Sequence, residues 1–207
     1  MISPAPGVVF SESSDGDLRT VDARRSLASR LGISGDWATV RQTHGAGVRF
    51  AQAGGDQGES DALITGPNGP PIAVFTADCV GIVARGDKHV AVIHAGWRGI
   101  VSGVVESLRR EFDERGDRVH GAWIGPSIGP CCYEVGDEVT TRFPPSCRTE
   151  TTWGTSAVDL WKAAEERLGA DEVWTARICT RHESGWWSYR KDGTRSRMAA
   201  VAWAGEP

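Results

Sequence analysis

Short apolar runs that end in glycine or proline dominate the chain. Runs of this kind, rich in Val and Ile, are typical of strands joined by tight turns. The strands that they predict cover residues 8–10, 37–42, 47–51, 71–76, 81–84, 89–94, 119–124, 173–178 and 199–202. The polar stretches at 54–60 and 144–152 are expected to be loops, and neither is long enough to link two domains.

A helical period is clearest over residues 100–114. Ile100, Val104, Leu108 and Phe112 recur there at helical spacing, and the charged residues fall largely opposite them. This pattern is typical of a helix with one buried face. Further helices are predicted over 21–31, 137–143 and 158–168. Because helices and strands follow one another without an internal repeat, the pattern predicts a mixed α/β (α+β) fold with one core.

Composition excludes two classes of partner. The 207 residues carry a net charge of −4 and no block rich in Lys or Arg, so the chain lacks the electrostatic footprint of a nucleic-acid binder. No apolar run approaches the roughly 18 residues that suggest a membrane span. Residues 1–6 lack the basic and apolar parts of a signal peptide. The odd number of cysteines, five, fits a reducing compartment, so we expect a cytoplasmic protein without nucleic-acid or membrane partners.

Three polar residues, His44, Cys79 and His94, stand at predicted strand ends beside small residues. Such strand ends are where a rigid scaffold presents side chains to a cleft. Two imidazoles and a thiolate form a ligand set that zinc favours, and three protein ligands leave a fourth position for water or substrate. The alternative is that both histidines are hydrogen-bonded at strand ends and Cys79 is a small buried apolar residue. Asp78 is expected to point away from Cys79 in an extended segment and to be structural.

Five motifs follow one another in an order that resembles a known family. They read QTHG at 42–45, SDALIT at 60–65, TADC at 76–79, HAGWRG at 94–99 and GPSIGPCCYEVG at 125–136. Cys179-Thr180, the segment at 188–193 and Arg197 are similar to the closing motif of that family. The family is known as the laccase-domain or polyphenol oxidase family, or the peptidoglycan editing factor family. Its members are now described as purine nucleoside phosphorylases.

The resemblance implies a fold and a metal centre. The fold would be a single domain over residues 1–207 with mixed sheets sandwiched between helices. The family's metal-binding positions match His44, Cys79 and His94, which would also be the catalytic residues. Zinc is the expected ion, and copper is less favoured. Family members usually carry a longer stretch before the first helix, where this chain has only residues 11–20.

Four further residues are expected to contact substrate. Arg98, at the start of a predicted helix, would hold an anion, or else pair with a surface carboxylate. Asp61 would orient a metal-bound histidine or accept a proton, or else cap a turn. Ser127 and Cys131 belong to a loop that can present backbone N–H groups and small side chains to a ligand. Cys132 would then face the core.

The resemblance implies a zinc-dependent purine nucleoside phosphorylase that acts on adenosine, inosine or methylthioadenosine with phosphate. A secondary adenosine deaminase activity is compatible with the same centre. Its partners would be a small-molecule nucleoside and phosphate, and the chain would be a monomer or a weak homodimer. One alternative is an amidase that edits peptidoglycan precursors with Cys79 as nucleophile. Another is a non-enzymatic binding module stabilised by zinc. Copper-dependent phenol oxidation is disfavoured, because five histidines are too few for a multicopper cluster.

Overall fold

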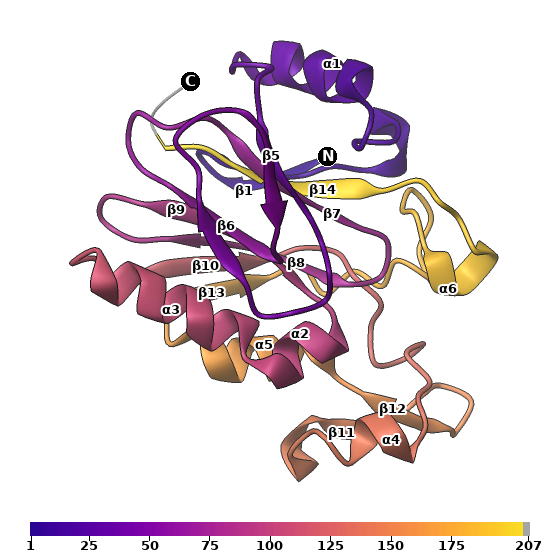
Figure 1. Ribbon diagram of the computed structural model, residues 1–207. Coiled ribbons are helices and arrows are strands. Elements are labelled where there is room, and N and C mark those ends of the chain that lie inside the picture. Colours follow the sequence, from indigo (N-terminus) through magenta and orange to yellow (C-terminus); the bar gives the residue numbers. More distant parts are fainter. Residues whose placement is uncertain (205–207) are drawn as a thin grey trace.

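Two six-stranded sheets lie between two layers of helices in the computed structural model of the protein, which describes residues 1–204 (Figure 1). Helix α1 (Val21–Leu31) covers the outer face of one sheet. The outer face of the other sheet is covered by three helices, α2 (Trp97–Ser102), α3 (Val104–Glu114) and α5 (Leu160–Leu168). The expected fold class, mixed sheets sandwiched between helices, is confirmed.

Each sheet mixes parallel and antiparallel neighbours. The first has the order β1 (Ile2–Ala5), β2 (Val8–Phe10), β14 (Met198–Ala202), β7 (Ile72–Thr76), β3 (Ala38–Arg41) and β5 (Gly55–Glu59). The second has the order β13 (Glu172–Thr175), β10 (Gly121–Ile124), β8 (Val80–Arg85), β9 (Val90–Ala95), β6 (Ala62–Thr65) and β4 (Val48–Phe50). β14, close to the C-terminus, runs antiparallel between β2 and β7 and so joins the two ends of the chain in one sheet.

The central strands are apolar throughout because both of their faces are buried. On β9, Val90 and Val92 point into the core between the two sheets, whereas Ala91 and Ile93 point toward the helices. Since side chains alternate along a strand, such a position leaves no face for polar residues. This explains why the strand signal in the sequence is a run of Val, Ile and Ala rather than an alternation with polar residues.

Local signals define α1 at both ends. The Thr20 side chain accepts a hydrogen bond from the Ala23 N–H group, and Gly32 ends the helix in the left-handed region with φ of 69°. Both features are common at helix ends, and the observed bounds are those predicted. The prediction of one helix over 100–114 was wrong in its continuity. Gly103, with φ of 85°, separates α2 from α3.

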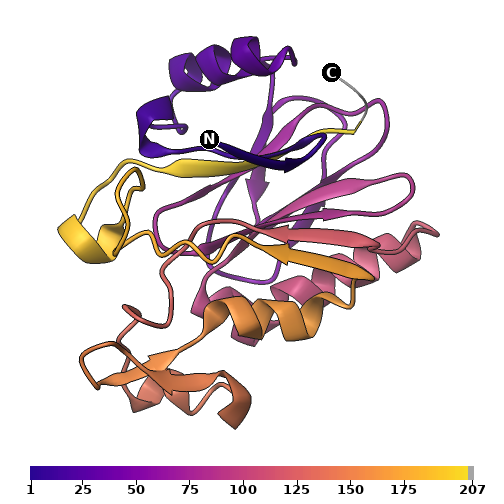
Figure 2. The same ribbon diagram turned by 180° about the vertical axis from the view of Figure 1, so that it is seen from behind.

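Two predicted loops also required correction. The stretch at 54–60 contains β5, which pairs in parallel with β3 at the edge of the first sheet. All of its residues are partly or fully exposed, so no apolar pattern marks it in the sequence. The stretch at 144–152 contains the short helix η2 (Pro145–Cys147) and β11 (Arg148–Glu150). β11 pairs with β12 (Ser156–Val158), and with α4 (Asp137–Thr140) they form an extension beyond the helical layer (Figure 2).

The remaining elements are short. Helix η1 (Ser13–Asp15) precedes α1, and helix α6 (Tyr189–Asp192) lies in the segment that leads into β14. Within residues 1–204, no helix combines the length and the apolar character needed to cross a bilayer.

Candidate metal centre

The three candidate ligands lie where the chain passes from one sheet to the other. His44 follows β3 of the first sheet and precedes β4 of the second. Cys79 lies in the short turn between β7 of the first sheet and β8 of the second. His94 is on β9, opposite Gly81 of β8. The two crossings therefore bring residues from both sheets to the same end of the sandwich.

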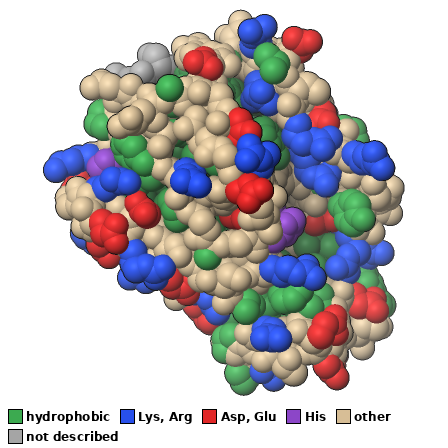
Figure 3. Space-filling view, in the orientation of Figure 1, with side chains coloured by type: hydrophobic (Ala, Val, Ile, Leu, Met, Phe, Trp, Pro, Cys, Tyr) green, Lys and Arg blue, Asp and Glu red, His purple; other side chains and the backbone are tan. Residues whose placement is uncertain are grey.

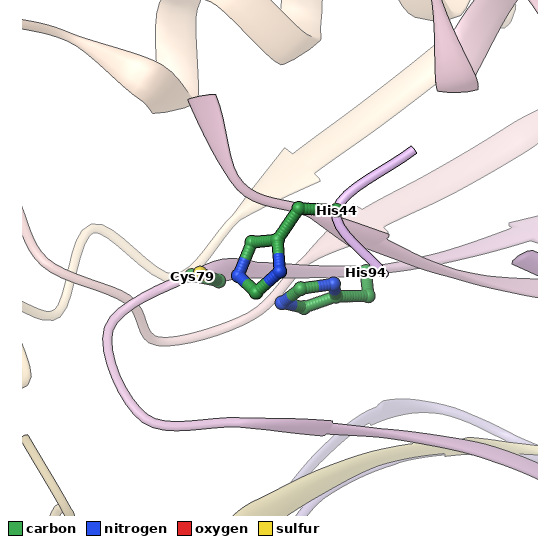
Figure 4. Close-up of side chains that lie close together, drawn as sticks. All are labelled: His44, Cys79 and His94. Carbon is green, nitrogen blue, oxygen red and sulfur yellow. The ribbon is translucent and has the colours of Figure 1, made fainter. Parts of the chain in front are cut away.

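His44, Cys79 and His94 converge on one point. Each offers a ligand atom, and these atoms all lie within 4.8 Å of one another. The two imidazole rings meet edge to face, with centroids 4.8 Å apart and an interplanar angle of 79° (Figure 4). His94 is buried, Cys79 is half-buried and His44 is exposed. The group is thus anchored in the core on one side and open on the other.

Asp61 contacts both histidines of the centre. Its fully buried carboxylate accepts hydrogen bonds from the backbone N–H groups of Thr43, His44 and Gly45, at 3.1, 2.9 and 2.7 Å. The same carboxylate lies 2.8 Å from Nδ1 of His94. This contact leaves Nε2 as the ring nitrogen of His94 that can bind a ligand. A carboxylate in this position fixes the orientation and the tautomer of a metal-binding histidine.

The backbone of His44 is in an unusual conformation. Its φ of 60° places a residue other than glycine in the left-handed region, which costs free energy and persists only when the surroundings enforce it. The hydrogen bonds from residues 43–45 to Asp61 supply that constraint. One carboxylate therefore positions both imidazoles, His94 by direct contact and His44 through its backbone.

The charges of the site favour a thiolate at Cys79. Burial alone would raise the pKa of Cys79, but the charge of His94 and hydrogen bonds from His44 and His94 outweigh it and lower the pKa to about 6. Burial would lower the pKa of His94, but Cys79 and Asp61 raise it to about 9. For Asp61, the hydrogen bond from His94 and those from the backbone outweigh burial and hold the pKa at about 2. The deprotonated thiolate is the form in which cysteine binds metals.

The donor set and its surroundings fit a divalent metal ion. Two histidines and a cysteine are ligands that zinc takes in catalytic sites, where a further position stays open. Gly96 leaves room beside them, because a Cβ atom there would lie 3.1 Å from both Cys79 Sγ and His44 Cδ2. A larger residue at this position would press against two of the three donors.

A cavity of about 640 Å³ opens over the three donors. Aromatic side chains of Phe75, Tyr133 and Tyr189 contribute to its walls. Four arginines also line it, namely Arg19, Arg41, Arg190 and Arg197. In the space-filling view, Lys and Arg side chains and a histidine border a hollow at the right of the molecule (Figure 3). The cavity is thus partly apolar and carries positive charge, which suits a ligand with an aromatic ring and an anionic group.

The other residues expected to contact substrate lie outside the set that lines this cavity. Arg98 is exposed at the start of α2, with its guanidinium 4.3 Å from the centre of the Trp97 ring. Ser127 is fully buried and accepts a hydrogen bond from Nε1 of Trp161 at 2.5 Å. Cys131 packs beside Cys132, with their sulfurs 3.6 Å apart. Burial and the neighbouring thiols raise the pKa of Cys131 to about 12, in contrast to Cys79.

Residues near the C-terminus contribute more to the cavity than the sequence led us to expect. The segment around α6 supplies Tyr189, Arg190 and Arg197. Asp78 holds this segment in place, since it accepts hydrogen bonds from Oγ1 of Thr180 at 2.7 Å and from the Arg190 N–H group at 2.6 Å. The turn at Asp78 is not extended, because its φ is 95°. The only signal in the sequence was the resemblance at 188–193 and Arg197.

The short N-terminal segment also reaches the cavity. Arg19, which lies between η1 and α1, is among the residues that line it. The Arg19 side chain pairs with Asp17, whose Oδ1 also accepts a hydrogen bond from the Arg197 N–H group at 3.2 Å. The two ends of the chain therefore meet at this side of the cavity.

Comparison with known proteins identifies the family. The model of a family described as multi-copper polyphenol oxidoreductase laccase matches residues 10–205. The chain belongs to this family. Within the polyphenol oxidoreductase laccase family, a relative from Streptomyces coelicolor, named purine nucleoside phosphorylase SCO2081, is 36% identical over 205 residues. The match covers 90% of this chain and 84% of that protein.

Other relatives of the chain carry different names. A relative from an unknown prokaryotic organism, named adenosine deaminase RL5, is 37% identical over 212 residues, which cover 88% of this chain and 80% of that protein. Among solved structures, YlmD from Geobacillus stearothermophilus matches with a TM-score of 0.79 and 29% identity. That match covers 90% of this chain and 80% of the other.

Proposed function

We propose that the protein is a zinc-dependent purine nucleoside phosphorylase that cleaves adenosine, inosine or methylthioadenosine with phosphate. The observation that carries the proposal is the open His44, Cys79 and His94 centre beneath a cavity lined by arginines and aromatic rings. The names of several relatives support it, including that of SCO2081. A multicopper centre fits less well, because two histidines, rather than a large set, meet at this site within residues 1–204.

The arrangement of the cavity suits a nucleoside and a phosphate together. In phosphorolysis, a phosphate oxygen attacks C1′ of the ribose while the bond from C1′ to the purine breaks. We assign the phosphate to Arg190 and Arg197, because both line the cavity and guanidinium groups bind phosphate oxygens in pairs. Aromatic side chains such as Phe75 and Tyr133 offer surface for the purine. A divalent ion at the three donors would supply Lewis acidity to a ligand in the cavity.

Tyr133 is suited to donate a hydrogen bond to the departing base. Burial raises the pKa of its hydroxyl to about 12, so the group is neutral near pH 7 and keeps its proton. The guanidinium of Arg190 lies 5.1 Å from the centre of the Tyr133 ring and fixes that wall of the cavity. A hydrogen bond from this hydroxyl would stabilise the negative charge that develops on the purine as it leaves with the bonding electron pair.

The test is to incubate the purified protein with adenosine and phosphate and to follow adenine and ribose 1-phosphate by chromatography. His94→Gln is expected to lower the rate by about two orders of magnitude or more, because it removes a ligand. His89→Gln is the matched control, since His89 also contacts an aspartate through Nδ1 but lies away from this cavity. The proposal fails if the wild type releases no base, or if both variants keep full activity.

Adenosine deamination is a second candidate because the relative RL5 carries that name. Deamination consumes water rather than phosphate, so inosine would form from adenosine in phosphate-free buffer. Ribose 1-phosphate would not form under these conditions. The two activities can therefore be separated by omitting phosphate from the same assay.

An amidase with Cys79 as nucleophile is the third candidate, favoured by the lowered pKa of that thiol. Removal of metal with a chelator distinguishes it from the proposal. A zinc-dependent enzyme loses activity and regains it when zinc is restored. A cysteine amidase keeps its activity toward peptidoglycan fragments after chelation and loses it when Cys79 is alkylated.

A further inference from the structure

A second group of candidate metal ligands consists of three cysteines, and it lies outside the cavity that opens over His44, Cys79 and His94. The ligand atoms of Cys131, Cys132 and Cys179 all lie within 4.8 Å of one another. Cys132 and Cys179 are buried and Cys131 is half-buried. All three are free thiols. The phosphorylase proposed above makes no use of them.

The backbone brings these cysteines together through a tight loop and a bridge. The N–H groups of Cys132 and Tyr133 both donate to the carbonyl oxygen of Gly129, at 3.0 Å each. Ser127 pairs with Cys179 in a short parallel bridge, which places the third sulfur against the loop. Gly129 is needed at this turn, since a Cβ atom there would lie 2.6 Å from the Trp161 ring.

We propose that Cys131, Cys132 and Cys179 form a second metal site, for a thiophilic ion such as Zn²⁺ or Cu⁺. Sulfurs that bind one zinc ion at about 2.3 Å lie about 3.8 Å from one another in a tetrahedral site. The sulfurs of Cys131 and Cys132 lie 3.6 Å apart, and all three sulfurs lie within 4.8 Å of one another, close to that value. Soft thiolate ligands select these same ions. A disulfide between the adjacent Cys131 and Cys132 would be strained.

The surroundings of the cluster offer its sulfurs one hydrogen-bond donor and one positive charge. The Gly129 N–H group donates to Cys179 Sγ at 3.2 Å. The Arg181 side chain lies beside Cys132 and offers a positive charge that offsets the charge of several thiolates. A cavity of about 350 Å³ is lined by Cys132, Arg181 and Glu134 and gives an ion a path from solvent. Arg181 would therefore offset part of the negative charge of bound thiolates, and an ion could reach the cluster from solvent.

An ion at this site would tie the 125–133 loop to the chain at Cys179, after β13. The loop ends at Tyr133, which lines the cavity over the candidate metal centre. The chain after Cys179 continues through Thr180 to Arg190, which lines the same cavity. The second ion would thus stabilise the walls of the cavity without contacting substrate.

The experiment titrates the reduced full-length protein with Zn²⁺ or, under ascorbate and without oxygen, with Cu⁺, and counts bound metal by mass spectrometry. The double variant Cys132→Ala/Cys179→Ala is expected to bind one ion fewer per chain than the wild type. Cys147→Ala is the matched control, because Cys147 is buried alone beside Glu166, and it should bind as many ions as the wild type. Equal binding by the double variant and the wild type, for both ions, overturns the proposal.

A second measurement on the wild type does not depend on a variant that folds. Cd²⁺ bound by thiolates absorbs in the ultraviolet in proportion to the number of sulfur ligands. The wild type should show the signal of about four thiolates, three from the cluster and one from Cys79, and Cys79→Ala should show that of about three. The signal of a single thiolate in the wild type, lost in Cys79→Ala, would contradict the second site. Because the two sites are counted separately, failure at one is not failure at the other.

Discussion

At the scale of single residues, two aspartates make the same set of contacts in different places. Asp61 binds three successive backbone N–H groups and Nδ1 of His94. Residues 87–89 form the turn between β8 and β9, and their N–H groups donate to the carboxylate of Asp117. The same carboxylate lies 2.9 Å from Nδ1 of His89. One aspartate thus positions the candidate metal centre and the other fixes a turn away from it. The pair allows the role of Asp61 at the site to be separated from its role in the fold.

Replacing Asp61 should weaken metal binding. In Asp61→Asn the backbone contacts can persist in part, but the carboxylate that orients His94 is lost, and we expect zinc affinity to fall about 10- to 100-fold. Competition with a chelating dye measures the change. Asp117→Asn should keep wild-type zinc affinity although it removes an equivalent carboxylate. If the two variants bind zinc equally well, Asp61 does not position the centre.

The contribution of Asp117 to stability should depend on pH. Burial would raise the pKa of Asp117, but hydrogen bonds from the Lys88 backbone and the His89 side chain lower it from 3.8 to about 2. Because the folded-state pKa is depressed, the ionised group stabilises the fold above pH 3.8, and this contribution is lost as the pH falls toward 2. The free energy of unfolding, measured with urea, should therefore decrease between these values more steeply in the wild type than in Asp117→Asn. Parallel curves would contradict this linkage.

At the scale of helices and strands, local chemistry accounts for what the sequence predicted. α1 has a capping threonine and a terminal glycine within its own segment, so its bounds could be read directly. All of the predicted strands overlap observed ones. The central strands are apolar throughout because both of their faces are buried, whereas the edge strands β4 and β13 carry apolar residues that are partly exposed. β5 was missed because it has no buried face, and its pairing with β3 depends on residues far from it in the sequence.

The break between α2 and α3 shows the same limit. The apolar residues keep a helical spacing across Gly103, so periodicity predicts one helix, whereas the backbone there is left-handed with φ of 85°. Gly103→Ala should destabilise the protein by about 1–2 kcal/mol, because alanine is strained in this conformation. Urea unfolding measures the loss. The exposed neighbour Ser102 is the control, and Ser102→Ala should change stability by less than about 0.5 kcal/mol.

At the scale of the whole molecule, the cavity depends on the C-terminal segment, which folds back to pair with strands from the first half of the chain. The candidate metal ligands come from residues 44–94, and chemistry together with family motifs was enough to select them. The cavity walls come also from Arg19 and from the segment around α6, which crosses the site because β14 pairs between β2 and β7. The spacing of apolar residues within a helix or strand carries no information on contacts between segments that lie far apart in the sequence. This explains why the arginines of the cavity were not selected as anion ligands from the sequence, although Arg98 was.

The proposed position of the phosphate rests on this architecture. Arg190 lines the cavity, and its backbone is held by Asp78, next to the candidate ligand Cys79. Arg98 lies over the Trp97 ring outside the residues that line the cavity. Arg190→Ala should therefore raise the KM for phosphate about tenfold or more, since hydrogen bonds between charged groups contribute about 1.5–3 kcal/mol, with a smaller effect on the KM for adenosine. Arg98→Ala should leave both values near those of the wild type. Initial rates at varied phosphate decide between them, and the reverse result would assign the anion to Arg98, as the sequence alone proposes.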